Sequence, residues 1–379
     1  MKIAFDGRIL GLTLTGVAEQ LINLVKYLIN QKVECFIIGP AKLQGTSDLK
    51  GAHFLTIERP RKIDLQEVHI ENYILPKLVA KISPDIYHCS LNWGIPKNLP
   101  CKTVLTIHDV IPFKILEALS DWQFKLYKNL INNSVKRASK VITISNFSKK
   151  DIIETLKVNQ SKIKVIYNGL TIPEKPKNLT QKLKSVKEKL NIKNKYFIAV
   201  GGFFERKNMP RIIEALALLK KKTAYGCQLI IPGKNEGTTY LDKQVDQCRK
   251  IIHDNALEKD VILPGYLERE DLEALILGST IVLYPSLYEG FGLPILEAMA
   301  ADVPVITSNI TALPEVAAGA AHMVNPYDFE EIFFGMKKIL EDKNYLDKLI
   351  KAGKKRILDF SWNKMGGETL SLYKGVLKA

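Results

Sequence analysis

The stretch KIAFDGRILGLTLTGVAEQLINLVKYLINQKVECFIIG, residues 2–39, decides the fold. Residues 2–5 form a short apolar run, which is typical of a buried strand. Residues 17–29 place apolar side chains at helical spacing, and residues 33–38 form a second apolar run that ends at Gly39. A strand, a loop, a helix and a strand in this order predict a βαβ unit and therefore a parallel sheet.

The same alternation continues along the chain. Further strands are expected at residues 85–88, 103–107, 141–144, 163–167, 196–200, 228–231, 281–284 and 303–307. Helices are expected at 121–138, 210–220 and 294–300, and a helical tail at 329–377 with a break near 360–362. Because a stretch rich in Pro and Lys at 170–180 interrupts the pattern, we expect two α/β domains, residues 1–172 and 173–361, with a ligand site in the cleft between them.

The composition fits a soluble globular protein that has anionic partners. The 379 residues carry a formal net charge of +15, which favours nucleic acid, an anionic membrane face or phosphorylated substrates. The five cysteines are scattered, so we expect reduced thiols and a cytoplasmic location. Asp6 would interrupt the apolar region of a signal peptide, and no stretch reaches the ~18 apolar residues of a membrane span. Any membrane contact should therefore be peripheral.

The strongest functional signal is EGFGLPILE, residues 289–297. Its glycines let the backbone approach a ligand, and Pro294 suits the first turn of a helix, whose N-terminus is an anion site fit for a diphosphate. Glu289 can point at a ligand, and Glu297 can accept hydrogen bonds from two vicinal ribose hydroxyls. A capped turn with two surface glutamates is the simpler alternative, but the whole arrangement favours a nucleotide site.

Three weaker signals accompany this motif. GGFFERKN, residues 201–208, places Arg206 and Lys207 after a strand, where they suit a diphosphate or form a solvated basic loop. The loop 11–16 has two glycines but lacks the Lys-Ser/Thr of a P-loop, so it is either a phosphate contact or a plain turn. His108 and Asp109 follow the strand at 103–107, an edge where ligands bind, although a lone His is more often structural.

Some expected signatures of other chemistry are missing from the sequence. There is no D-x-D triplet to hold a metal on a diphosphate, and there is no H-E-x-x-H or G-x-S-x-G motif. We therefore expect no cofactor and no metal.

Together these motifs resemble a family-4 (group 1) retaining glycosyltransferase of the GT-B fold. The spacing Glu289-x7-Glu297 matches the signature of that family, and the resemblance covers essentially the whole chain. It implies a nucleotide-sugar donor bound by the second domain, and a C-terminal helix at 362–379 that completes the first domain. This chain departs from many members in having Gly202 where they carry an Arg. The charge of Arg206 would replace it.

The resemblance also implies residue roles. Arg206 and Lys207 would neutralise the departing diphosphate, and Glu297 would hold the ribose. Glu289 would hold the sugar hydroxyls, and His108 would lie at the reactive face of the sugar. The remaining donor-binding residues are expected to be Gly16, Gly202, Phe291, Gly292 and Leu293. Fixed cations can stabilise a leaving anion without a metal. A double displacement of the glycosidase type needs two carboxylates at the anomeric carbon, and Glu297 is assigned to the nucleotide, so we expect a front-face displacement rather than a covalent glycosyl–Glu289 intermediate.

The Arg-Lys-Asn order and the His108-Asp-x-x-Pro112 motif resemble a subgroup of mannosyl- and rhamnosyltransferases of surface polysaccharides. We therefore expect GDP-mannose as donor, with UDP- and TDP-sugars as alternatives, and a saccharide or lipid-linked acceptor. The helix at 121–138 carries lysines beside Trp122 and Tyr127, so it either rests on the anionic inner face of the cell membrane or is simply solvated.

Three other functions stay open at this point. One is an epimerase or phosphorylase of the same fold, and another is a non-catalytic protein that binds nucleotide-sugars. The third, nucleic-acid binding, has only the high pI of about 9.3 in its favour, and no recognised motif predicts specific binding.

Overall fold

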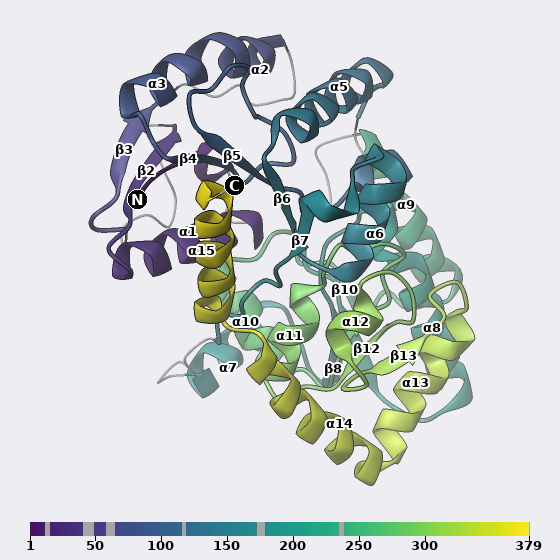
Figure 1. Ribbon diagram of the computed structural model, residues 1–379. Helices are drawn as coiled ribbons and strands as arrows, with labels where there is room; N and C mark the ends of the chain where they lie inside the picture. Colours follow the sequence, from purple (N-terminus) through teal and green to yellow (C-terminus); the bar gives the residue numbers. More distant parts are fainter. Residues whose placement is uncertain are drawn as a thin grey trace. The chain divides into compact units, whose positions relative to one another are not determined.

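In the computed structural model, the structure describes residues 1–11, 16–40, 49–57, 65–115, 119–172, 179–234 and 239–378. The chain divides into two compact units (Figure 1). The first unit contains Met1–Gly169 and Phe360–Ala379, and the second contains Leu170–Asp359. Part of the expected linker, residues 173–178, lies outside the described residues.

The first unit is built on a parallel sheet with strand order β3-β2-β1-β4-β5-β6-β7. Its strands are β1 (Lys2–Asp6), β2 (Glu34–Gly39), β3 (His53–Thr56), β4 (Ile86–Cys89), β5 (Lys102–Thr106), β6 (Lys140–Thr143) and β7 (Ile163–Val165). The α-helices are α1 (Gly16–Asn30), α2 (Leu65–His69), α3 (Leu75–Ile82), α4 (Ile111–Lys114), α5 (Asp121–Arg137), α6 (Asn146–Leu156) and α15 (Trp362–Lys378), and Ile70–Ile74 forms a π-helical turn. The strand order reverses between β1 and β4, and ligands bind at such a point in open α/β sheets.

The C-terminal helix α15 is part of the first unit, where it lies beside α1 (Figure 1). Gly366 allows this close packing, because a Cβ placed there would lie 2.3 Å from the Tyr27 ring. Tyr373 reaches the sheet, and its hydroxyl lies 2.5 Å from Nδ1 of the buried His88. The last seventeen described residues are thereby fixed to a core that is built mainly by the first part of the chain.

The second unit is built on a parallel sheet with strand order β10-β9-β8-β11-β12-β13. Its strands are β8 (Lys195–Ala199), β9 (Cys227–Ile230), β10 (Val261–Ile262), β11 (Ile281–Tyr284), β12 (Val305–Ser308) and β13 (His322–Val324). The helices are α7 (Leu179–Lys189), α8 (Met209–Lys222), α9 (Thr239–Asp254), α10 (Arg269–Leu277), α11 (Leu293–Ala300), α12 (Leu313–Ala317), α13 (Phe329–Glu341) and α14 (Lys343–Arg356). Here the order reverses between β8 and β11.

The predicted fold class, two Rossmann-like parallel-sheet domains, is confirmed. The five cysteines are all free thiols. The helical tail differs in detail from the prediction, because it also breaks at Asp342, whose side chain accepts a hydrogen bond from the Tyr345 amide at 2.9 Å and begins α14. No helix in the described ranges is long and apolar enough to cross a membrane.

Candidate active site

Two cations and one carboxylate meet where β8 and β11 end. Arg206 and Lys207 lie in a short turn after β8, and Glu289 lies in the loop after β11. Arg206 Nη1 donates to Glu289 Oε1 at 2.9 Å, and Lys207 Nζ donates to the same oxygen at 2.5 Å. The structure therefore brings together three of the four residues that the sequence suggested for catalysis.

Tyr284, the last residue of β11, holds Lys207 from a second side. Lys207 Nζ donates to the Tyr284 hydroxyl at 2.7 Å and lies 4.6 Å from the centre of its ring. Sequence reasoning missed this residue, because in the apolar run 281–284 a tyrosine is read only as part of a buried strand. Tyr284 lies at the carboxyl end of a strand, beside the point where the strand order reverses, and this position was the signal that could have indicated a role in the site.

The two cations determine the charge state of Glu289. Burial by itself would raise the pKa of Glu289, but the nearby Lys207 and then Arg206 outweigh that effect, and the pKa lies below its ordinary value. Glu289 is therefore ionised at neutral pH and pairs with both cations.

The turn that carries the cations is fixed to the β11 loop by its backbone and by Asn208. Leu287 N donates to Arg206 O at 2.7 Å. Asn208 adopts a left-handed φ of 62°, which asparagine tolerates better than most residues, and its buried Nδ2 donates to Pro285 O at 3.0 Å and to Pro326 O at 2.7 Å. These contacts set where Arg206 and Lys207 stand. Sequence reasoning missed this role of Asn208, since its partners lie up to 118 residues away.

The rest of the 289–297 motif forms the start of α11. Gly292 has a φ of 113° and precedes the helix, and a Cβ there would lie 2.7 Å from Leu313 Cδ2, so another residue would meet both strain and a clash. Leu293 is the first helical residue, Phe291 is buried, and Glu297 is half-buried on the helix. The helix dipole favours an anion at this N-terminus, where Pro294 has no N–H and the Ile295 amide donates to Gly292 O at 3.0 Å.

Gly202 meets a second glycine from the next loop. Its φ is 70°, and a Cβ built on Gly233, which follows β9, would lie 2.5 Å from the Gly202 Cα. The two backbones thus touch without side chains between them. A side chain on Gly233 would push the loops that follow β8 and β9 apart, whereas a Cβ on Gly202 would lie 3.8 Å from the Gly233 Cα, an ordinary contact.

Two of the predicted site residues belong to the first unit. Gly16 is the exposed first residue of α1, and residues 12–15 of the glycine loop lie outside the described residues. His108 follows β5 and is buried, with Nε2 positioned 3.1 Å from Ser90 O and its amide donating to Asn92 Oδ1 at 3.0 Å. Burial lowers the pKa of His108 to about 4, so the ring is neutral at pH 7.

Comparisons with known proteins identify the family of each part of the chain. The family described as "Glycosyltransferase Family 4" matches residues 14–172, and the family described as "Glycosyl transferases group 1" matches residues 180–356, the segment that contains Arg206, Lys207 and Glu289. The chain belongs to the group 1 glycosyltransferases.

Curated relatives of this glycosyltransferase include enzymes of O-antigen synthesis. The O-antigen chain mannosyltransferase B of Escherichia coli is 29% identical over 99% of this chain and 100% of its own length. The O-antigen chain mannosyltransferase RfbU of Salmonella typhimurium is 32% identical over 63% of this chain and 61% of its own. A serotype-specific mannosyltransferase of Escherichia coli is 28% identical over 78% of this chain but only 38% of its own length.

Solved structures share the fold at low sequence identity. A glycosyltransferase from Rickettsia africae covers 100% of this chain and 98% of its own, with a TM-score of 0.74 and 21% identity. Anabaena HepE, solved in complex with UDP and glucose, covers 98% of this chain and 99% of its own, with a TM-score of 0.74 and 20% identity.

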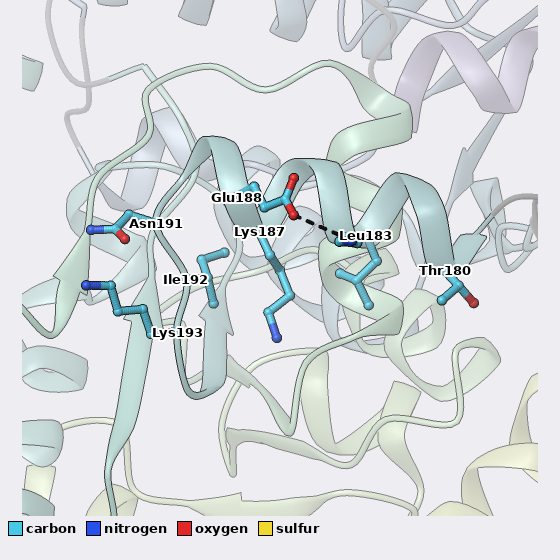
Figure 2. A pocket seen from close by; sticks show the side chains of 8 residues that line it. Thr180, Leu183, Lys187, Glu188, Asn191, Ile192 and Lys193 are labelled. Carbon is cyan, nitrogen blue, oxygen red and sulfur yellow. Dashed lines mark ion pairs between the residues drawn. The ribbon is translucent and has the colours of Figure 1, made fainter.

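A surface hollow lies elsewhere in the second unit of this glycosyltransferase, along α7 (Figure 2). It has a volume of about 640 Å³ and is lined by Thr180, Leu183, Lys184, Lys187, Glu188, Asn191, Ile192 and Lys193. None of the residues of the candidate active site lines it. Its lysines are useful as exposed controls for Arg206 and Lys207.

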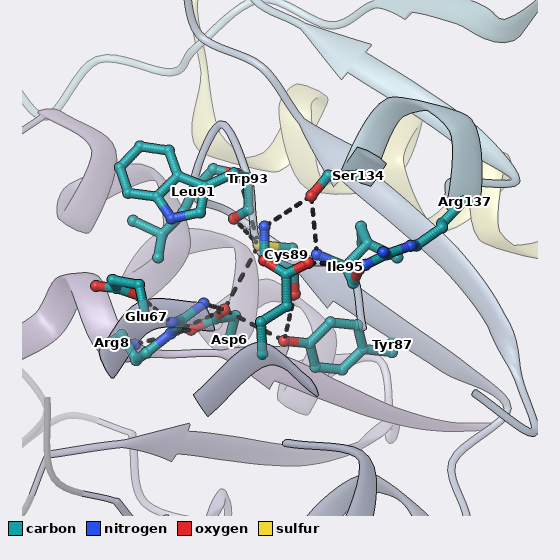
Figure 3. Close-up of polar contacts among 12 residues, drawn as sticks. Asp6, Arg8, Glu67, Tyr87, Cys89, Leu91, Trp93, Ile95, Ser134 and Arg137 are labelled. Atoms are coloured by element: carbon teal, nitrogen blue, oxygen red, sulfur yellow. Dashed lines mark hydrogen bonds and ion pairs between the residues drawn. The ribbon is translucent and has the colours of Figure 1, made fainter. Parts of the chain in front are cut away.

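The first unit contains a charged cluster of its own around Arg8, at the carboxyl end of β1 (Figure 3). Arg8 is completely buried, and its guanidinium donates to Asp6, at the end of β1, at 2.6 Å and to Glu67 at 2.5 Å. Arg137 donates to the buried Glu71 at 2.8 Å. Burial raises the pKa of Glu71 to about 7 against the opposing effect of Arg137 and Arg8. Sequence reasoning missed this cluster, because Arg8 and Glu67 are 59 residues apart.

Proposed function

We propose that this protein transfers mannose from GDP-mannose to a saccharide or lipid-linked saccharide acceptor in the synthesis of a surface polysaccharide. The observation that carries the proposal is the convergence of Arg206 and Lys207 on Glu289, beside the N-terminus of α11. The choice of mannose rests on the relatives, which are named as O-antigen mannosyltransferases.

In the proposed reaction the donor diphosphate lies at the N-terminus of α11, where Arg206 and Lys207 offset the charge that grows as it leaves. Glu297 accepts hydrogen bonds from the ribose hydroxyls, and Glu289 accepts from hydroxyls of the sugar. The donor contacts Gly16, Gly202, Phe291, Gly292 and Leu293 through their backbones.

The bond changes follow from these positions. The acceptor oxygen attacks the anomeric carbon on the face from which the diphosphate departs, so the configuration is retained. The acceptor proton moves to the departing phosphate oxygen, and the products are the glycoside and GDP. His108, which is neutral because burial lowers its pKa to about 4, hydrogen-bonds the sugar without adding charge. Because two side-chain cations supply the positive charge, transfer proceeds without a divalent metal.

A UDP-sugar is the second candidate donor. It is favoured by the fold shared with Anabaena HepE, which was solved with UDP and glucose. The two donors differ in base and sugar but share the diphosphate, so the roles of Arg206 and Lys207 are the same for both.

We also propose that the protein works in the cytoplasm on the inner face of the membrane, through α5. This helix exposes 53% of Trp122, and Lys125, Lys128 and Lys136 are exposed on it as well. An aromatic ring among cations suits an anionic lipid surface that presents a lipid-linked acceptor. If flotation with vesicles showed no dependence on anionic lipid, this part of the proposal would be wrong.

The direct test is a transfer assay with GDP-, UDP-, TDP- and ADP-sugars, run with and without EDTA. We expect one nucleoside diphosphate to be released, dependent on an acceptor, and EDTA to have no effect. Donor isomerisation without an acceptor would instead indicate an epimerase, and binding without any turnover would indicate a non-catalytic binding protein.

A further inference from the structure

Thr311 has a backbone conformation that its side chain opposes. It lies in the turn between β12 and α12, with a φ of 61°. In this left-handed region the Cβ crowds the backbone, and a β-branched residue is a marked outlier there. Holding Thr311 in this conformation therefore costs folding free energy.

The other described residues of this kind have a local reason for it. Ten described residues other than glycine have positive φ. Seven of them follow the end of an α-helix by one or two positions, where the left-handed conformation is standard: Lys32, Ser83, Lys157, Asn191, Ala256, Asp302 and Ala318. Two more, Asn98 and Asn208, are asparagines, which tolerate it. Thr311 fits neither group.

The hydroxyl of Thr311 is also unsatisfied. Its Oγ1 is buried and has no hydrogen-bond partner within the described part of the chain. A buried polar group without a partner destabilises the fold, and most such groups are satisfied in native proteins. Strain and an unmet hydroxyl thus coincide at one residue, as is typical of positions kept for binding.

The turn at Thr311 packs against the loop of the candidate active site. The amide of the next residue, Ala312, donates to Glu289 O at 3.4 Å. The following residue, Leu313, packs against Gly292. A Cβ built on Gly292 would lie 2.7 Å from Leu313 Cδ2. Thr311 is therefore adjacent in space to the residue that we assign to the sugar hydroxyls.

From this we infer that Thr311 is a further donor-binding residue, whose hydroxyl bonds the sugar of the nucleotide-sugar beside Glu289. The inference rests on the proposed function and deepens it. The strain is retained because the left-handed turn holds the side chain beside the sugar. The hydroxyl is buried in the free protein, and a rotation about χ1 brings it to the bound sugar, which supplies the missing hydrogen-bond partner.

The test compares Thr311→Ser, Thr311→Ala and Thr311→Gly with Ala318→Gly, which relaxes a left-handed residue at the end of α12, away from the loop. Calorimetric titrations use GDP-mannose and GDP, with UDP-glucose and UDP in parallel, and Tm is measured for every variant. Tm should be roughly a few °C higher in Thr311→Gly than in Thr311→Ala, since glycine removes the strain. For the same reason Tm should be higher by a similar amount in Ala318→Gly than in the wild type. Thr311→Ala and Thr311→Gly should weaken nucleotide-sugar binding roughly threefold to tenfold, the loss of one hydrogen bond. Nucleoside diphosphate binding should change less than about twofold, and Thr311→Ser and Ala318→Gly should bind like the wild type.

Two results would overturn the inference while leaving the proposed function intact. One is wild-type affinity for the nucleotide-sugar in Thr311→Ala. The other is an equal loss of nucleotide-sugar and nucleoside diphosphate binding together with a lower Tm, which would make Thr311 a structural residue. If the wild type binds none of the four ligands, the proposed function and this inference fail together.

Discussion

The two units differ in how deeply the charged groups at the carboxyl ends of their strands are buried. In the first unit Arg8 pairs with Asp6 and Glu67, and the three side chains are 0–2% exposed. Arg137, which pairs with the buried Glu71, is 19% exposed. In the second unit Arg206 and Lys207 pair with Glu289, and the three side chains are 17%, 8% and 11% exposed. We therefore expect the group around Arg8, the first cluster, to serve the fold, and the group around Glu289, the second cluster, to reach an anionic ligand.

The largest effect is expected from removing Arg8. Arg8→Met leaves Asp6 and Glu67 buried without their cation, and we expect the free energy of unfolding to fall by about 3–5 kcal/mol. Urea unfolding measures the change. Arg249→Met, at an exposed ion pair on α9, is the control and should change stability by less than about 0.5 kcal/mol. Equal stability of Arg8→Met and the wild type would show that the cluster does not hold the first unit together.

Removing a cation of the second cluster should affect catalysis instead. In Lys207→Ala the leaving diphosphate loses a fixed charge, and we expect kcat/KM for the donor to fall about 10²- to 10³-fold. Lys184→Ala, on the hollow along α7, is the matched control and should retain full activity. An active Lys207→Ala enzyme would mean that Lys207 serves only to hold Glu289.

The buried Glu71 of the first unit predicts a pH dependence of stability. The pKa of Glu71 is raised by burial to about 7, so the folded chain retains a proton that the unfolded chain loses near pH 4.5. This contribution is complete below pH 4.5 and is lost as pH rises through 7. Glu71→Gln should remove this contribution. The difference in the free energy of unfolding between the wild type and Glu71→Gln should therefore change by about 1–3 kcal/mol between pH 4.5 and 8. Parallel stability–pH curves would contradict this assignment.

Two buried histidines of the first unit, His88 and His108, act in the opposite direction. Burial lowers the pKa of His88 to about 3 and that of His108 to about 4. Their contribution to stability is present above pH 6.5 and is lost as pH falls. Both proteins in the Glu71 comparison contain these histidines, so the difference between the curves isolates Glu71.

The smallest effect is expected from removing the charge of Glu289 in the second cluster. Glu289→Gln removes the negative charge that pairs with both cations, so it should tighten the binding of free nucleoside diphosphate, itself an anion, roughly twofold to tenfold. Transfer should become slower in the same variant, since Gln replaces the carboxylate assigned to the sugar. Weaker nucleoside diphosphate binding in Glu289→Gln would mean that the carboxylate organises the cations rather than competing for them. Calorimetry with GDP and UDP distinguishes these outcomes.

Local sequence patterns predicted the fold class and three members of the second cluster. Apolar runs separated by helical periodicity predicted parallel sheets, and glycine spacing with adjacent charges singled out Arg206, Lys207 and Glu289. The short edge strands β3 and β13 were not predicted, because segments of three or four residues with half-exposed side chains carry little periodicity.

The missed residues depend on contacts between distant parts of the chain. Tyr284 and Asn208 act on residues 77 to 118 positions away. The partners of Arg8 include Glu67, and the strain at Thr311 is a backbone property that residue type does not reveal. Such features become visible only once the strands are placed side by side.

The central claim is that the second unit holds a nucleotide-sugar at the carboxyl ends of its strands. Calorimetric titration of GDP-mannose and UDP-glucose into the wild type and Glu297→Ala tests it most directly, with Glu188→Ala on α7 as the matched carboxylate control. We predict saturable binding of one donor that is at least tenfold weaker in Glu297→Ala, through loss of its charged hydrogen bonds to the ribose, and unchanged in the control. Binding that is indifferent to Glu297, or no binding of either donor, would contradict the account.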